Sequence, residues 1–462
     1  MAPKFGTSGL RGLVTELSDG LCAGYARAFL AAVPHRGRLF LGRDLRASSP
    51  RIAAAVAAAA AEAGVAVADC GELPTPALAL AAMRAGAPSV MVTGSHIPAD
   101  RNGLKFYTAT GEITKADEAA ILAAYAGDRA APSARAEPEP SAMSAYRARY
   151  VAAFGPSALR GLRVGLWQHS SVARDLLAGL LADLGAEVLP LGRSEVFVPV
   201  DTEAVDGATR ARLAAWAADE RLDALVSTDG DADRPLVADE TGAVVPGDVI
   251  GTLTALALGA DTVVTPVSSN TMIETSGRFA RVLRTKIGSP YVIAGMEAAM
   301  TGPAPRTVGF EANGGFLLGF AAAGPAGPLP PLMTRDAVLP ILAPLSEAVR
   351  QGRRLSALVA TLPARRTAAD RLEDVPTEAS QALVRRLADD PRDRAALLGH
   401  LGPEAGLDLT DGLRIRFTSG AIVHLRPSGN APELRCYAEA DSAGAAETLV
   451  RDTLAALRTR LA

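Results

Sequence analysis

The stretch Ser89-Val90-Met91-Val92-Thr93-Gly94-Ser95-His96 indicates the fold class of this chain. Its first four residues are typical of a short buried strand, and the next four form a loop with a glycine and a hydroxyl group. Outward from it, strands are expected over residues 38–44 and 65–69, and helices over residues 49–64 and 76–85. Strands that alternate with helices predict βαβ units in a largely parallel sheet, with functional loops at the carboxyl ends of its strands.

The same alternation recurs in two further segments. In the second segment, strands are expected over residues 162–166, 187–191 and 223–227, and helices over residues 172–184 and 208–220. In the third, strands are expected over residues 261–265 and 308–310. Residues 322–332 are rich in Pro, Gly and Ala, and they predict a loop at or beside the active site.

The C-terminal segment has a different pattern. Alternating stretches over residues 413–417, 421–425 and 433–437 are separated by turn residues, and a helix is expected over residues 443–457. This pattern predicts an antiparallel α+β unit. We therefore expect an α/β protein of four domains, with a linker over residues 127–143 after the first unit. The expected domains are residues 1–140, 141–247, 248–355 and 356–462.

Composition excludes several functional classes. The formal net charge of −3 lacks the basic field of a general nucleic-acid binder. Cys22, Cys70 and Cys436 lie far apart, which predicts neither a disulfide framework nor a zinc motif. The start of the chain has no basic-then-apolar signal pattern, and the Ala-rich residues 53–61 are too few to span a bilayer. We expect a cytoplasmic protein with neither a nucleic-acid nor a membrane partner.

Three alternating aspartates, Asp229, Asp231 and Asp233, directly follow an expected strand. Like charges so close are costly unless a cation or an arginine compensates them, and carboxylate oxygens suit a divalent cation. A calcium loop between two helices is one alternative, since Glu240 falls at its twelfth position, but Arg234 occupies the sixth, where glycine is expected. A solvated acidic loop is the other. The preceding strand favours a metal site of the strand-end kind.

Other polar loops have both a functional and an ordinary interpretation. Ser95 could carry a phosphoryl group, although a lone serine more often caps a turn. Lys105 could act there as an acid, a base or a fixed positive charge. Glu311 and Asn313 could bind vicinal sugar hydroxyls, or simply form a polar turn. The segment from Arg426 to residue 430 offers a guanidinium, a hydroxyl and an amide for a terminal phosphate, but a tight turn between strands is the alternative.

Taken together, five segments resemble the α-D-phosphohexomutase superfamily, whose members isomerise hexose 1- and 6-phosphates. They occur in the family's order and approximate spacing, and the resemblance covers nearly the whole chain. It implies three related mixed α/β domains and a C-terminal antiparallel α+β domain around a central cleft. The segments are Gly6-Thr7-Ser8-Gly9-Leu10-Arg11-Gly12, Thr93-Gly94-Ser95-His96-Ile97-Pro98, Asp229-Gly230-Asp231-Ala232-Asp233-Arg234, Glu311-Ala312-Asn313-Gly314-Gly315 and Arg426-Pro427-Ser428-Gly429-Asn430.

The resemblance also implies residue roles. Ser95 would be the phosphoserine, and its phosphate would bind Mg²⁺ together with Asp229, Asp231 and Asp233. The reaction centre would be lined by Arg11, His96 and Lys105, with Arg234 beside the metal loop. Glu311 and Asn313 would contact the sugar. The phosphate that is not transferred would be bound by Arg426, Ser428, Gly429 and Asn430.

The overall pattern is most similar to bacterial phosphomannomutases and phosphoglucomutases. It implies interconversion of mannose 1-phosphate and mannose 6-phosphate through a phosphoserine and a hexose 1,6-bisphosphate, with that bisphosphate as activator and small-molecule sugar phosphates as partners. The oligomeric state stays open. Phosphoglucomutase and phosphoglucosamine mutase activities are alternatives, as are a metal-dependent phosphatase and a catalytically silent paralogue that binds sugar phosphates. The retained serine, aspartates, lysine and arginine argue against the silent paralogue.

Three departures from the family pattern bear on substrate and activity. Ile97 stands where Asn is common, and Asn430-Ala431 stand where Thr-Glu is usual. Asn430 can still donate a hydrogen bond to phosphate, so we expect activity to survive. Asn313 stands where many hexose mutases have Ser, and an asparagine there is similar to acetylhexosamine-phosphate mutases. The identity of the hexose therefore stays open at this stage.

Overall fold

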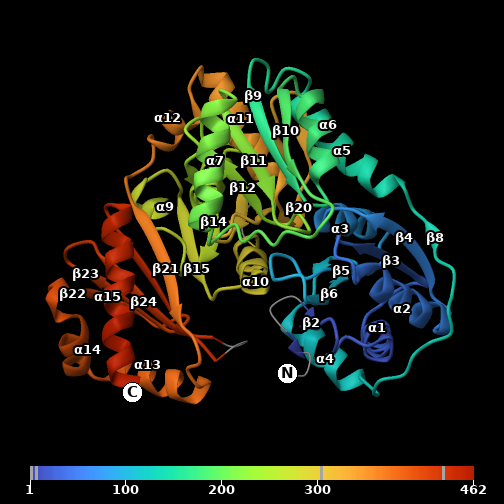
Figure 1. Ribbon diagram of the computed structural model, residues 1–462, viewed down its shortest axis with the longest axis horizontal. Helices are drawn as coiled ribbons and strands as arrows, with labels where there is room; N and C mark the ends of the chain where they lie inside the picture. The colour runs from blue at the N-terminus through green and yellow to red at the C-terminus, as the bar shows by residue number, and fades with distance from the viewer. Residues whose placement is uncertain (1–3, 6–8, 302–304, 429–431, 462) are drawn as a thin grey trace.

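The computed structural model describes residues 4–5, 9–301, 305–428 and 432–461. Within these ranges the chain forms four larger sheets and one two-stranded sheet. Figure 1 shows the first unit and the C-terminal unit at opposite sides of the molecule, with the second and third units between them. The predicted α/β architecture with a C-terminal α+β unit is confirmed, and the central cleft stays a prediction.

The first unit has an eight-stranded sheet in the order β1-β2-β6-β5-β3-β4-β8, with β7 paired to β6. Its middle strands β5, β3 and β4 are parallel, whereas β1, β2, β6 and β7 join antiparallel. The elements are β1 (Lys4–Phe5), β2 (Gly9–Leu13), α1 (Asp19–Ala32), β3 (Arg38–Arg43), α2 (Ser49–Glu62), β4 (Ala66–Glu72), α3 (Thr75–Arg84), β5 (Ser89–Val92), β6 (Arg101–Thr108), β7 (Gly111–Glu112), α4 (Lys115–Ala124) and β8 (Glu137–Pro138).

The second unit has a five-stranded sheet in the order β10-β9-β11-β12-β13. Strands β10, β9 and β11 are parallel, and β12 and β13 continue the sheet antiparallel. The elements are α5 (Ser141–Phe154), β9 (Arg163–His169), α6 (Arg174–Asp183), β10 (Glu187–Arg193), α7 (Gly207–Asp219), β11 (Ala224–Thr228), β12 (Pro235–Ala238) and β13 (Val244–Val245).

The third unit repeats this topology in the order β15-β14-β16-β17-β20, with the small sheet β18-β19 beside it. The elements are α8 (Gly247–Ala257), β14 (Thr262–Pro266), α9 (Met272–Thr275), β15 (Arg281–Thr285), α10 (Ser289–Ala299), β16 (Thr307–Phe310), β17 (Phe316–Leu318), β18 (Ala322–Ala323), β19 (Pro328–Leu329), β20 (Leu332–Asp336), α11 (Val338–Gln351) and α12 (Leu355–Val359). In all three units, three parallel strands are therefore followed by an antiparallel return strand.

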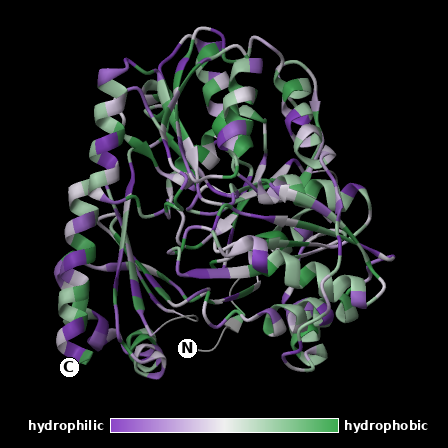
Figure 2. Ribbon diagram, turned by 45° about the vertical axis from the view of Figure 1, so that its right-hand side comes forward, coloured by the Kyte–Doolittle hydropathy of each residue, from purple (hydrophilic) through white to green (hydrophobic). Residues whose placement is uncertain are grey.

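The C-terminal unit is an antiparallel sheet in the order β21-β25-β24-β23-β22. Helix α15 packs on β21 and β25, and Figure 2 shows hydrophilic and hydrophobic residues alternating along it, as expected for a helix with one buried face. The elements are β21 (Arg366–Leu372), α13 (Thr377–Asp389), α14 (Pro391–Leu398), the 3₁₀ helix η1 (Gly399–Leu401), β22 (Glu404–Asp408), β23 (Leu413–Phe417), β24 (Ile422–Pro427), β25 (Leu434–Ala440) and α15 (Ala443–Leu461).

Several expectations need correction. The first sheet is mixed rather than largely parallel, because β6 turns back against β5 after the serine loop. The expected linker contains β8, which pairs with β4, and the start of α5. Residues 322–332 were expected to form a loop, but they contain β18 and β19, and residues 326 and 327 hydrogen-bond to the end of α5 at Ala153. Their position at or beside the active site stays a prediction. Helix α12 crosses the predicted boundary at residue 355, so that boundary belongs nearer β21.

The apolar cores divide the molecule differently from the sheets. One cluster contains residues of all three α/β units, among them Phe40, Leu176 and Phe310. The C-terminal unit has a separate cluster that runs from Leu372 to Leu457. The first three units therefore share a continuous core, to which no described residue of the C-terminal unit after residue 365 contributes. In the described part of the chain, no helix is both long and apolar enough to cross a membrane.

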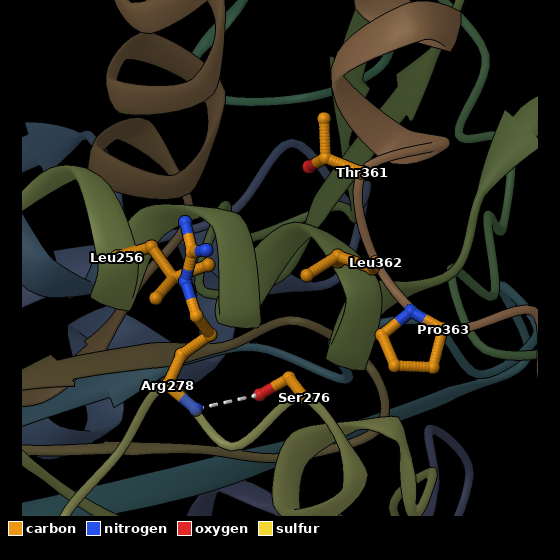
Figure 3. Close-up of a pocket in the computed structure, with 6 residues that line it drawn as sticks. All are labelled: Leu256, Ser276, Arg278, Thr361, Leu362 and Pro363. Carbon is orange, nitrogen blue, oxygen red and sulfur yellow. Dashed lines mark hydrogen bonds between the residues drawn. The ribbon is translucent and has the colours of Figure 1, made fainter.

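A cavity of about 330 Å³ lies where α8, the end of α9 and the segment before β21 meet (Figure 3). At its edge the backbone N–H of Arg278 donates to Ser276 Oγ at 3.3 Å. No site residue predicted from the sequence lines this cavity, so it is separate from the candidate site. Its lining residues are Leu256, Ser276, Arg278, Thr361, Leu362 and Pro363.

Candidate active site

Each of the three α/β units contributes one loop to a common polar cluster. The loop lies at the same place in each topology, between the third parallel strand and the antiparallel return strand: β5 to β6, β11 to β12, and β16 to β17. These loops carry Ser95, the three aspartates and Glu311, respectively. The carboxyl ends of parallel strands are where α/β proteins place their functional groups, and the sequence predicted these positions.

The serine and aspartate loops meet directly. Ser95 is fully buried, and its Oγ donates a hydrogen bond to Asp229 Oδ2 at 2.6 Å. Ser95 has a φ of +54°, in the left-handed region that non-glycine residues seldom adopt, and such strain is typical of functional positions. A Cβ on Gly230 would lie 2.9 Å from the carbonyl oxygen of Ser95. Only glycine allows the two loops to approach this closely.

A buried ion pair that sequence reasoning missed supports the serine loop. The guanidinium of Arg46 donates to four backbone carbonyls of this loop, at Ser95, Ile97, Pro98 and Arg101, at 2.6–3.0 Å. Arg46 Nε also donates to Asp44 Oδ2 at 3.1 Å. A guanidinium has five N–H donors in a fixed plane, so it can hold a tight loop through its carbonyls.

Cations and a hydroxyl surround the aspartates, all of which are fully buried. Lys105 Nζ donates to Asp231 Oδ2 at 2.5 Å and to Asp233 Oδ2 at 2.6 Å. Thr75 Oγ1 donates to Asp231 Oδ2 at 2.6 Å. Arg335 Nη2 lies 3.0 Å from Asp233 Oδ2. Lys105 therefore contacts two of the three aspartates, and its role in a reaction centre stays a prediction. The contacts of Thr75 and Arg335 with the aspartates were not predicted.

The aspartate cluster fits a metal ion. One ligand oxygen from each of Asp229, Asp231 and Asp233 can be chosen so that all three lie within 4.8 Å of one another. Among the described residues, the Oδ1 atoms of Asp231 and Asp233 are buried without a hydrogen-bond partner. A buried carboxylate oxygen without a partner is costly, and a divalent cation removes that cost. The donor set, entirely carboxylate oxygens, is the kind that a hard cation prefers.

Electrostatics differ along the triad. Burial, and then the neighbouring Asp231 and Asp233, raise the pKa of Asp229 well above its usual value. Burial would also raise the pKa of Asp233, but Arg335, Lys105 and Arg234 together lower it below its ordinary range. Three cationic side chains thus surround Asp233, whereas Asp229 accepts the hydrogen bond from Ser95.

The basic residues on the other side of Ser95 predict an anion. Arg234 Nη1 lies 3.0 Å from His96 Nδ1, and His96 Nδ1 lies 3.4 Å from Ser95 Oγ. Burial, followed by Arg234 and Arg11, lowers the pKa of His96, so its imidazole is neutral. Burial, with Arg234 and Arg335 nearby, lowers the pKa of Arg11 to about 10. A bound phosphate would relieve the repulsion that lowers the pKa of Arg11.

The loop that carries Glu311 and Asn313, named here the sugar loop after its predicted role, is joined to this cluster through Arg335 and to the second unit through Thr202. Glu311 Oε2 lies 3.6 Å from Arg335 Nη1, and Asn313 Nδ2 donates to Glu311 Oε2 at 3.4 Å. Thr202 Oγ1, from the second unit, donates to the carbonyl of Asn313 at 3.0 Å. Glu311 and Asn313 therefore lie beside the metal loop with their carboxylate and amide close to each other.

The predicted phosphate loop lies in the C-terminal unit, apart from these contacts. Arg426 forms its described ion pair with Asp411, at 2.8 Å, rather than with any residue of the aspartate loop. Ser428 is buried, and its backbone N–H donates to Glu433 O. Gly429 and Asn430 lie outside the described residues. The structure thus assembles Arg11, Ser95, His96, Lys105, Asp229, Asp231, Asp233, Arg234, Glu311 and Asn313, but does not connect Arg426 to them.

Charged residues next to buried strands were the one sequence signal that could have pointed to the residues that were missed. Asp44 and Arg46 follow β3, the central parallel strand, and Arg335 lies near the end of β20 between buried residues. Charged residues at the ends of buried strands seldom occur without a partner. Their partners could not be inferred from the sequence, because they come from other units.

Comparison with known proteins identifies the origin of this arrangement. The phosphoglucomutase/phosphomannomutase alpha/beta/alpha domains I, II and III match residues 2–131, 133–242 and 246–365, and the C-terminal domain of that family matches residues 375–456. The chain belongs to the phosphoglucomutase/phosphomannomutase family. The predicted superfamily is thereby confirmed, together with the enzymatic class of phosphohexomutases.

Family members named phosphomannomutase are similar over their full length. One from Sinorhizobium fredii is 49% identical over 100% of both chains, and one from Salmonella muenchen is 44% identical over 99% of this chain and 96% of its own. A phosphoglucosamine mutase from Saccharopolyspora erythraea is 32% identical over 99% and 100%. The crystal structure of a phosphoglucomutase/phosphomannomutase family protein from Burkholderia thailandensis shares the fold, with a TM-score of 0.77 at 21% identity over 98% and 97%.

Proposed function

We propose that this protein is a Mg²⁺-dependent phosphomannomutase, which interconverts mannose 1-phosphate and mannose 6-phosphate through phospho-Ser95 and a hexose 1,6-bisphosphate. The observation that carries the proposal is the hydrogen bond from the Ser95 hydroxyl to Asp229 within a buried triad that suits a cation. The two phosphomannomutases at 49% and 44% identity support mannose phosphates as the substrates.

The charged groups near Ser95 suit a phosphorylated serine. The carboxylates Asp229, Asp231 and Asp233 face three cationic side chains, Lys105, Arg234 and Arg335. Mg²⁺, which the three aspartates and a phosphate oxygen on Ser95 would hold, would neutralise charge on the phosphoryl group. A phosphoserine supplies ~2 negative charges and acceptor oxygens, which suit both the metal ion and the neighbouring arginines.

In the first half-reaction, the bond between Ser95 Oγ and phosphorus breaks while a bond forms from phosphorus to the free hydroxyl of the hexose monophosphate. The hydroxyl loses a proton and Ser95 gains one, so the proton count is unchanged. Arg11 and Arg234 would hold the transferring phosphate, and Lys105 would supply fixed positive charge near the leaving oxygen. Such transfer depends mainly on positioning and charge neutralisation, which buried and ion-paired side chains provide.

In the second half-reaction, the bisphosphate must present its other phosphate to Ser95. The sugar contacts must therefore tolerate both orientations of the ring, whereas the distal phosphate needs the same anchor each time. Glu311 and Asn313 would bind ring hydroxyls, and Arg426 with Ser428, Gly429 and Asn430 would hold the distal phosphate. A cytoplasmic location and the bisphosphate as activator belong to the same proposal.

The decisive experiment is ³¹P NMR of the protein with Mg²⁺, a catalytic amount of hexose 1,6-bisphosphate and mannose 1-phosphate, with a Ser95→Ala sample as control. Growth of a mannose 6-phosphate signal without free phosphate, absent from the control, is expected. Release of inorganic phosphate instead would identify a phosphatase. No conversion by the wild type would refute the proposal and lead to glucose and glucosamine phosphates as the next substrates.

Phosphoglucosamine mutase is the second candidate function. The observation that favours it is Asn313, whose amide lies beside Glu311 and could contact a substituent at the sugar's second carbon. The 32% identity to a phosphoglucosamine mutase is weaker support than the match to the two phosphomannomutases. Parallel assays with mannose 1-phosphate and glucosamine 1-phosphate at equal concentration decide between them by the ratio of kcat/KM.

A further inference from the structure

Arg335 is a buried residue of β20, in the third unit, and its side chain contacts carboxylates of all three α/β units. Its side chain is 3% exposed. Each nitrogen of the guanidinium lies near a carboxylate of a different unit: Nε is 3.2 Å from Glu112 Oε1, Nη2 is 3.0 Å from Asp233 Oδ2, and Nη1 is 3.6 Å from Glu311 Oε2. A planar guanidinium can satisfy three directions at once, which a lysine ammonium on a flexible stem cannot do in the same geometry.

We propose that Arg335 is a positioning residue that orients the metal loop and the sugar loop together. The proposal rests on the proposed function for its sugar half, but its metal half stands on the aspartate cluster alone. By holding Asp233 at Oδ2, Arg335 leaves Oδ1 of the same carboxylate without a hydrogen-bond partner among the described residues, with Arg234 Nε 3.8 Å away. By lying next to Glu311 Oε2, the same group also places the carboxylate that would bind the sugar.

The backbone around Arg335 is built for this contact. A Cβ on Gly315, in the sugar loop, would lie 3.0 Å from the carbonyl oxygen of Asp233 and 3.1 Å from Arg335 Cδ. The absence of a side chain at residue 315 therefore lets the arginine stem and the metal loop lie against the sugar loop. The close approach of these three segments places Arg335 against the metal loop and the sugar loop at once.

Glu112 anchors the third nitrogen of the guanidinium. Its other carboxylate oxygen, Oε2, accepts a hydrogen bond from Ser289 Oγ at 2.6 Å, at the start of α10. Glu112 is 7% exposed, so its ion pair with Arg335 is protected from water. Glu112 thus holds the arginine in place although it would contact neither the metal nor the sugar. Residues that orient metal ligands without binding the metal commonly act in this way.

The test measures metal and sugar affinity separately. Mn²⁺ binding to the unphosphorylated protein is followed by electron paramagnetic resonance, and mannose 1-phosphate binding by calorimetry, for the wild type, Arg335→Met and Arg335→Lys. We expect Arg335→Met to weaken both affinities by ~10–100-fold, the usual effect of removing a group that orients metal ligands. Arg335→Lys should lie between, because it keeps the charge but not the fork.

The matched control is Arg394→Met. Arg394 is also buried and paired, to Glu404 at 2.9 Å, but it lies in the C-terminal unit. It should leave both affinities within twofold of the wild type. Glu311→Gln combined with Arg335→Met should weaken sugar binding no more than the worse single variant, since both remove one contact.

Two results would overturn the proposal. One is Mn²⁺ affinity within twofold of the wild type in both folded Arg335 variants, and the other is a loss equal to that of Arg394→Met. If Arg335→Met does not fold, Arg335→Lys decides by the same criteria. A wild type that neither turns over nor binds mannose 1-phosphate, but loses Mn²⁺ affinity on Arg335→Met, would refute the proposed function and uphold the metal half of this proposal.

Discussion

The aspartate loop and the phosphate loop are held in opposite ways. Around the aspartates, buried side chains from the first and third units, Lys105, Thr75 and Arg335, contact the second unit. The three units also share a continuous apolar core. Arg426 instead pairs with Asp411 of its own unit, whose apolar core is separate.

Hydrogen bonds join the C-terminal unit to its neighbour. Thr271 donates from its N–H to Glu439 Oε2 at 3.0 Å, and the N–H of Ile287 donates to Asp411 Oδ2 at 2.9 Å. Apolar cores resist deformation because their side chains are closely packed and leave little space to move into. Hydrogen bonds at a surface, in contrast, can be exchanged for hydrogen bonds to water. We therefore expect the region around Ser95 and the aspartates, proposed to transfer phosphate, to be held rigidly, and the region around Arg426, proposed to bind the distal phosphate, to be attached more loosely.

The largest effect should come from Ser95→Ala. Removing the hydroxyl removes the group that accepts the phosphoryl, so kcat should fall by at least about 10³-fold, as for other nucleophile deletions. The melting temperature should change little, since alanine fits the space. The measurement is mutase turnover by coupled assay with a thermal melt of the same sample; normal turnover in a folded variant would remove Ser95 from the mechanism.

Gly230→Ala tests whether the serine and aspartate loops are packed as tightly as their contacts indicate. The added Cβ would meet the Ser95 carbonyl at 2.9 Å, and the two loops must move apart. A displacement of ~1 Å at a reacting centre can cost about 10²-fold in kcat. Steady-state kinetics compare it with Gly444→Ala, where the added Cβ meets nothing within 4 Å. Unchanged kcat would mean that the loops tolerate separation.

Arg426→Ala tests the proposed binding of the distal phosphate by Arg426. Loss of a charge-assisted phosphate contact should raise KM by roughly 10–100-fold with a smaller change in kcat, because the reacting centre is built from other units. The exposed Arg416→Ala, on the adjacent strand β23, is the control for general loss of positive charge. A variant with unchanged KM would show that Arg426 does not bind the substrate.

The smallest effect concerns acid stability. Burial lowers the pKa of His424, in β24, and of His169, in β9, to about 4. The unfolded chain takes up these protons near pH 6.5 while the folded chain does not, so stability is complete above about pH 6.5 and falls as the pH drops toward 4. Each histidine should contribute a slope of up to ~1.4 kcal/mol per pH unit in this window.

Urea unfolding at pH 7.5 and 5.0 measures this loss. If the C-terminal unit unfolds separately, His424→Gln should reduce the acid sensitivity of that transition and leave the other unchanged. A single transition whose acid sensitivity His424→Gln reduces as a whole would argue that the two regions are as firmly joined as the first three units are to one another. Equal acid sensitivity in both proteins would contradict the role of His424.

Much of the fold could be predicted from short local patterns. The strand over residues 89–92 and the helix starting at residue 443 were found because apolar periodicity and turn residues act within a few positions. β21 was not predicted, because its exposed and polar residues show no alternation, and it is a strand only through pairing with β25. β8 similarly exists through its pairing with β4.

The candidate site divides in the same manner. Ser95, the three aspartates and Glu311 could be predicted because each stands in a short motif directly after a buried strand. Arg46 and Arg335 could not, since neither lies in such a motif and each acts on a loop remote in sequence. An arginine near a strand end is chemically informative only once its carboxylate or carbonyl partners are known.

Local sequence patterns were enough to place chemical groups at strand ends, and therefore to predict the family, the aspartate triad and the serine. Which charges meet depends on the tertiary structure. Lys105 and Asp231 are 126 positions apart, yet their side chains lie 2.5 Å from each other. The antiparallel return of β6 and the shared core of three units bring them together, because pairing of distant segments depends on the whole packed chain rather than on local preference.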